Sequence, residues 1–90
     1  MTIKVSRFGE ILTSRPEGRE AALVLLSSDL RHILEPASID FSGILVMTPS
    51  WLSEFTQTLM ARGIKQLKFM PSTNSSVIES IKFIELEKTA

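Results

Sequence analysis

The sequence predicts an α/β fold: a two-layer domain in which a mixed sheet of about four strands carries three helices, mainly on one of its faces. Short apolar segments typical of strands alternate along the chain with longer segments of helical periodicity. The strand–helix–strand order favours right-handed crossovers between parallel strands. The chain of 90 residues is long enough for a single domain, residues 1–90, with one modest core.

The composition argues against several classes of function. Ten basic and ten acidic residues cancel, and a neutral chain is poorly suited to electrostatic capture of nucleic acid or of a membrane surface. The chain has no cysteine and one histidine, which excludes disulfides, thiolate zinc sites and histidine-rich metal sites. Its longest apolar run, residues 21–26, is far shorter than the ~20 residues of a membrane span. Because neither a disulfide staple nor a secretory signal is visible, we expect a cytoplasmic protein. We also expect no cofactor.

The first segment, residues 2–8, alternates between apolar and polar side chains and is predicted to be a strand. Gly9 is predicted to turn the chain, so that residues 10–12 form a short return strand and a hairpin. Ser14 is predicted to cap the first helix, which ends near residue 28 or continues to residue 34 after a second cap.

A buried strand is predicted over residues 37–41, followed by a turn at Ser42 and Gly43. Asp40 stands at the end of this strand, where its carboxylate could orient a ligand or, as we favour, accept N–H bonds from the turn. Residues 44–47 are apolar and are predicted to cross the end of the sheet.

The start of the second helix is the strongest local signal in the chain. Thr48 offers a capping hydroxyl, and Pro49 occupies the first helical position. Trp51 is either a binding residue for a partner or a core residue. Arg62 and Gly63 are predicted to end the helix. The apolar residues predicted to face the sheet are Leu52, Phe55 and Leu59.

The last strand is predicted over residues 64–70, and Pro71 ends it. Ser76 and Glu79 have the spacing of a capping box, which predicts the start of a third helix at that point. Residues 85–90 form a polar tail that is predicted to fray.

Two of these segments resemble a known family. Asp-Phe-Ser-Gly-Ile at residues 40–44, followed by Thr-Pro-Ser-Trp-Leu at residues 48–52 and by Glu54, resembles the turn and helix start of the STAS-like domains of unknown function. Weaker likenesses are found at residues 8–15 and at the Asn-Ser-Ser-Val of residues 74–77. The resemblance covers nearly the whole chain and implies a two-layer STAS-like sandwich.

More distantly, the middle of the chain resembles true STAS domains, the fold of the anti-sigma-factor antagonists. Their phosphorylatable serine falls on Ser50, which the resemblance would make a phospho-acceptor recognised by a histidine-kinase-type ATPase. Three positions depart from their motif. Thr48 replaces the acidic residue, Pro49 replaces the first serine, and Trp51 replaces the glycine. The alternative interpretation, which does not depend on this resemblance, is that Ser50 is an ordinary serine in the first turn of the helix and makes only local hydrogen bonds.

No catalytic constellation accompanies these motifs: His32 has no triad context, and the four glycines are too scattered for a phosphate loop. We therefore expect a non-catalytic regulatory or protein-interaction module that presents the start of the second helix to a protein partner, with a histidine-kinase-type ATPase as the partner class that the resemblance implies. The predicted partner-binding residues are Thr48, Pro49, Ser50, Trp51 and Glu54. The alternative is a small-molecule or nucleotide site that uses the same helix start to bind an anion.

Overall fold

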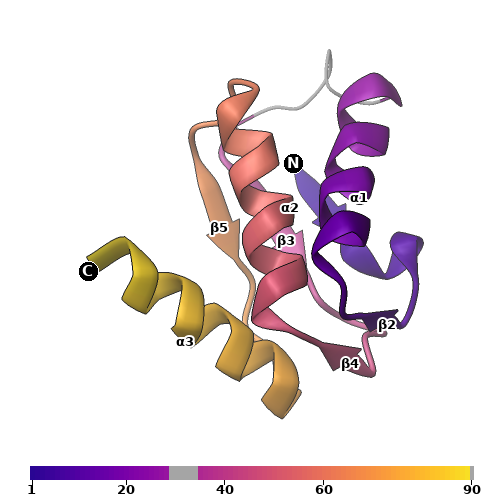
Figure 1. Ribbon diagram of the computed structural model, residues 1–90, viewed down its shortest axis with the longest axis vertical. Helices are drawn as coiled ribbons and strands as arrows, with labels where there is room; N and C mark the ends of the chain where they lie inside the picture. The colour runs from indigo at the N-terminus through magenta and orange to yellow at the C-terminus, as the bar shows by residue number, and fades with distance from the viewer. Residues whose placement is uncertain (29–34, 90) are drawn as a thin grey trace.

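The computed structural model describes residues 1–28 and 35–89 and has an α/β fold (Figure 1). The alternative continuation of the first helix to residue 34, and with it His32, lies outside the described residues. In chain order the elements are β1 (Thr2–Lys4), the 3-10 helix η1 (Val5–Phe8), β2 (Ile11–Leu12), α1 (Arg15–Ser28), β3 (Ala37–Asp40), β4 (Val46–Met47), α2 (Pro49–Ala61), β5 (Leu67–Phe69) and α3 (Ser75–Thr89).

Three strands form a parallel sheet in the order β1-β3-β5. Ile3, Ile39 and Phe69 lie opposite one another in this sheet, and because successive side chains of a strand alternate between faces, they share the face that contributes to the core. The helices α1 and α2 lie side by side over this face, whereas α3 packs against α2 and β4 (Figure 1). Helices therefore lie mainly on one face of the sheet, as predicted.

The predicted hairpin and the single four-stranded mixed sheet are not formed. The chain leaves the sheet after Lys4, because η1 follows β1 directly and turns the backbone away. The strand β2 consequently has no neighbour in the main sheet and pairs in parallel with β4, so that Ile11 lies opposite Val46. Two small parallel sheets replace the mixed one among the described residues.

The predicted helix ends are confirmed where they depend on local contacts. At the start of α1, the Ser14 hydroxyl oxygen accepts the backbone N–H of Glu17 at 3.3 Å. At the end of α2, Gly63 has a φ of +108° and donates its N–H to the Met60 carbonyl at 3.2 Å, as in a glycine-capped terminus. The α2 residues that were predicted to face the sheet, Leu52, Phe55 and Leu59, are all buried in the core.

The predicted capping box of α3 is wrong, since Asn74 caps this helix instead. Its side-chain carbonyl oxygen accepts the N–H groups of Ser76 at 2.9 Å and of Val77 at 3.3 Å. The Ser76 hydroxyl oxygen accepts the N–H of Met47 at 3.1 Å, so this hydroxyl serves the contact between α3 and β4. The helix consequently begins at Ser75, and Glu79 is an exposed residue of its second turn.

Candidate functional site

The start of α2 has the predicted geometry. Thr48 is the extended N-cap, and its hydroxyl oxygen accepts the N–H of Trp51 at 3.4 Å while it donates to the carbonyl of Thr13 at 2.7 Å. Pro49 is the first helical residue, where a missing N–H has no consequence. The Thr48 hydroxyl thus caps α2 and also connects it to the segment that follows β2.

The predicted binding residues of this helix start differ in exposure. Thr48, Pro49, Ser50 and Glu54 are all partly exposed. Trp51, in contrast, is only 1% exposed, and its ring stacks on Phe55 with the ring centroids 4.9 Å apart. Of the two interpretations of Trp51, the structure supports the core residue, and its buried ring is not accessible to a partner.

Trp51 is buried because α1 crosses α2 very closely at this point. Gly18 lies directly over the backbone of Trp51, and a Cβ atom on Gly18 would be only 2.3 Å from the Trp51 carbonyl oxygen. Any larger residue at position 18 would force the two helices apart. The absence of a side chain at Gly18 therefore lets α1 cover Trp51.

An ion pair bridges α1 and α2 beside this crossing. A guanidinium nitrogen of Arg15 lies 3.2 Å from a carboxylate oxygen of Glu54, and both side chains remain partly exposed. The predicted binding residue Glu54 thus already has a partner inside the chain. The sequence offered no sign of this contact, because the two residues are 39 positions apart.

Asp40 has the structural role that we favoured. Its carboxylate accepts the N–H of Ser42 at 2.9 Å, and Gly43 adopts a φ of +86° in the same turn. The backbone hydrogen bond from Ser42 lowers the pKa of Asp40, with smaller contributions in the same direction from the Ser42 hydroxyl and from the charge of Lys4. Asp40, Ser42 and Gly43 therefore stabilise the turn after β3.

An exposed apolar surface, not predicted from the sequence, lies directly before the start of α2. Ile11 and Val46 are paired across β2 and β4, and they are 61% and 44% exposed. Leu45, the residue before β4, is 61% exposed. The next residues along the two strands, Leu12 and Met47, are buried. We call Ile11, Leu45 and Val46 the β2–β4 surface.

Asn74 holds the segment behind this surface in place. Besides capping α3, its side-chain amide donates to the carbonyls of Ile44 at 2.8 Å and of Leu45 at 3.0 Å. Together with the contact between Ser76 and Met47, these bonds fasten β4 to the first turn of α3. The sign that could have identified Asn74 is its residue type, because Asn is among the preferred N-cap residues and stands directly before this helix.

The start of α2 offers few groups for the alternative function of anion binding. Pro49 has no N–H, that of Trp51 is bonded to the Thr48 hydroxyl, and that of Leu52 is bonded to the Thr48 carbonyl at 3.2 Å. Such a site depends on free backbone donors. Within residues 1–28 and 35–89, no group of three or more His, Cys, Asp or Glu side chains could hold a metal ion. The helices of this same part of the chain lack the length and apolarity of a membrane span.

Comparison with known proteins adds no relative: the chain matches no protein-family model, no curated protein and no solved structure.

Proposed function

We propose that this protein is a non-catalytic interaction module of STAS-like type, which binds a protein partner through the β2–β4 surface and the adjoining start of α2. The exposed pair of Ile11 and Val46 is the observation that supports this proposal most directly. Removing such apolar side chains from water on binding is favourable, and contiguous exposed apolar patches are typical of interaction sites.

The surface is held rigidly, which also favours binding. The Thr48 hydroxyl fastens the start of α2 to the segment after β2, and Asn74 fastens the segment before β4 to α3. A surface that is already ordered loses little conformational entropy when a partner binds. The partly exposed residues Pro49 and Ser50 continue this surface onto the helix.

The partner class follows from the resemblance to STAS domains, and we propose a histidine-kinase-type ATPase with Ser50 as the phospho-acceptor. Ser50 is partly exposed in the first turn of α2, where a phosphate would lie at the positive end of the helix dipole. Trp51 has no part in the proposed interface, because its ring is buried.

The binding surface is tested with Ile11→Asp and Val46→Asp, singly and together, against histidine-kinase-type ATPases of the source genome. We expect the double variant to lower affinity by at least about tenfold, since two carboxylates would be buried against the partner. Leu86→Asp on α3 is the control, because this leucine is also exposed but lies on another element. Equal binding by the wild type and the double variant, with all variants folded by circular dichroism, would exclude this surface.

The role of Ser50 needs a separate test. Incubation with the ATPase and ATP, followed by mass spectrometry, is expected to add one phosphate to the wild-type protein and none to Ser50→Ala. Phosphate on another residue, or on none, would remove Ser50 as the acceptor while leaving the binding surface open to its own test.

A further inference from the structure

A hollow of about 380 Å³ lies between α1 and the η1–β2 segment, and Trp51 of α2 also lines it. Its accessible apolar lining consists of Phe8, Ile11 and Val24, whereas Ala21 and Trp51, which also border it, are almost fully buried. The remaining lining residues are the exposed acids Glu17 and Glu20. We call this feature the α1–η1 groove. It is continuous with the β2–β4 surface, because Ile11 belongs to both.

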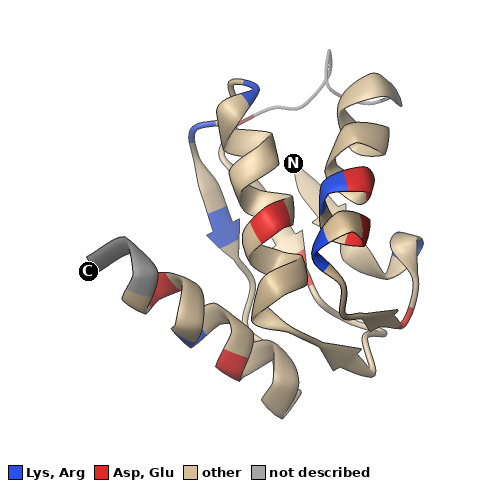
Figure 2. Cartoon of the chain, in the orientation of Figure 1, with Lys and Arg blue, Asp and Glu red and all other residues tan. Residues whose placement is uncertain are grey.

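The groove is acidic because two exposed glutamates of α1, Glu17 and Glu20, line it. Glu20 also lines a second hollow, between α1 and α2, together with Arg15 and Arg19. Figure 2 colours the acidic and basic positions of α1. No basic residue lines the groove within the described part of the chain. The guanidinium of Arg7, on η1, lies over the ring of Phe8 at 5.4 Å from its centroid.

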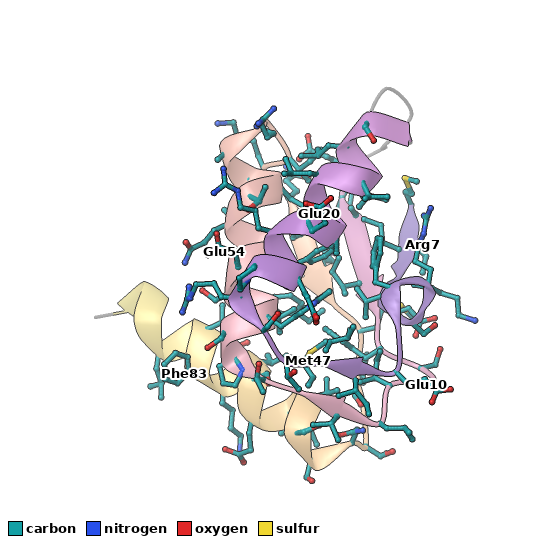
Figure 3. The ribbon with its side chains drawn as sticks, turned by 45° about the vertical axis from the view of Figure 1, so that its right-hand side comes forward. Arg7, Glu10, Glu20, Met47, Glu54 and Phe83 are labelled. Atoms are coloured by element: carbon teal, nitrogen blue, oxygen red, sulfur yellow. The ribbon has the colours of Figure 1, made fainter. Side chains whose placement is uncertain are left out.

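The shape of the groove favours a helix as its occupant. Glu17, Ala21 and Val24 follow one another at i, i+4 and i+7, so they form a ridge along the open side of α1. Val24 is 44% exposed on this ridge. The opposite wall is formed by Phe8 on the 3-10 helix η1 and by Ile11 on β2, a strand of only two residues that offers little edge for β-addition (Figure 3). A second helix can place its own ridge beside that of α1.

We propose that the α1–η1 groove binds an amphipathic helix of the protein partner, with apolar side chains on one face and Lys or Arg residues beside them. The apolar face would cover Val24 and Ile11, and the cations would approach Glu17 and Glu20. This inference rests on the proposed function, since it specifies the chemistry of a partner that binds at the adjoining surface. The charge requirement gives it a test of its own.

The direct test uses fluorescent peptides of about 14 residues, long enough to form a helix on binding. The probe has Leu at i, i+3, i+4 and i+7 with Lys elsewhere. One comparison peptide replaces Lys by Glu, and another scrambles the Leu/Lys sequence. Fluorescence anisotropy is expected to show binding of the Leu/Lys peptide at least about tenfold tighter than of either comparison peptide. Equal affinity for the Leu/Glu or the scrambled peptide would overturn the proposal.

Charge reversal on the protein supplies the matched test. Glu20→Lys is expected to weaken binding of the Leu/Lys peptide about fivefold, because an attraction becomes a repulsion. Glu79→Lys changes the net charge equally but lies on the exposed side of α3, and it should change affinity less than about twofold. Equal effects of the two reversals would mean that the peptide senses only net charge, and this would also overturn the proposal.

The two proposals can fail separately. If Ile11→Asp with Val46→Asp abolishes binding of the ATPase while Glu20→Lys leaves it unchanged, the proposed function stands and the basic helix is wrong. If the Leu/Lys peptide binds and depends on Glu20 but no ATPase binds, the groove has the inferred chemistry and the proposed partner class is wrong. If sedimentation shows a dimer that Glu20→Lys dissociates, the occupant is a second copy of the chain and the proposal fails.

Discussion

The two sides of helix α1 differ sharply although they belong to the same fourteen residues. On the side of α2, Gly18 brings the helices into backbone contact over Trp51, and Arg15 pairs with Glu54. On the other side, Val24 is exposed beside a groove whose α1 wall carries Glu17 and Glu20. The comparison shows that one helix of this small domain packs closely against α2 on one side and leaves Val24 exposed on another.

The difference has a steric cause. At the covered side, the smallest residue permits an approach that excludes water and closes the core over the largest side chain of the protein. At the open side, a hollow lies between α1 and the η1–β2 segment, and the side chains of Glu17 and Glu20 remain exposed. The close packing on the covered side therefore depends on Gly18.

The largest expected effect contrasts two adjacent residues of α1. Leu25→Ala should lower the free energy of unfolding by about 3 kcal/mol, because Leu25 is fully buried and its removal leaves a cavity. Val24→Ala should change it by less than about 0.5 kcal/mol, since this side chain is on the open side. Urea denaturation measures both values, and similar losses for the two variants would contradict the division of the helix.

The next effect concerns the close crossing of the helices. Gly18→Ala should cost about 2 kcal/mol, because the new methyl group would overlap the Trp51 carbonyl and push α1 from α2. In a helix without such a contact, Gly→Ala is stabilising by roughly 1 kcal/mol. A loss of stability in place of this gain would therefore be evidence for the close contact with Trp51. Glu20→Ala, two residues along the same helix, is the control and should be nearly neutral. A Gly18→Ala protein as stable as the wild type would show that the contact is not tight.

A smaller effect is expected for the ion pair across the covered side. A double-mutant cycle with Arg15→Ala and Glu54→Ala should give a coupling energy of about 0.5 kcal/mol, because both side chains are partly exposed and water screens them. The coupling should fall when NaCl is raised to about 0.5 M. A coupling that is independent of salt would contradict an electrostatic origin.

The smallest effect is expected at Asp40, whose carboxylate accepts a backbone hydrogen bond in the turn after β3, whereas Glu17 and Glu20 are exposed at the groove. Because its pKa is lowered in the folded protein, folding favours the ionised form. The stabilisation is therefore present above about pH 4, the ordinary range of an aspartate, and is lost as the pH falls through the lower folded-state value. Asp40→Asn should consequently lower the melting temperature slightly at pH 7, and this difference should shrink as the pH is lowered from about 4. A difference that stays the same as the pH is lowered would contradict this role.

Much of the local structure follows from the sequence because neighbouring residues decide it. Ser14, Thr48 and Gly63 act on backbone groups within one turn of their own position, so the starts of α1 and α2 and the end of α2 could be predicted. The Asx contact of Asp40 has the same local nature. The start of α3 was misplaced because two capping residues, Asn74 and Ser76, compete there, and Met47 takes the hydroxyl of the latter.

The candidate site was predicted in part: the start of α2 is partly exposed as expected, but Trp51 is not. Its burial depends on Gly18, which is 33 positions away, and the β2–β4 surface depends on a strand pairing between residues 35 positions apart. The sequence by itself determined the α/β class, the presence of the three helices and the caps at Ser14, Thr48 and Gly63, because these depend on short-range hydrogen bonds and periodicity. Only the tertiary structure decided which strands pair, which side of α1 is covered and where apolar side chains stay exposed, because these depend on contacts between distant segments.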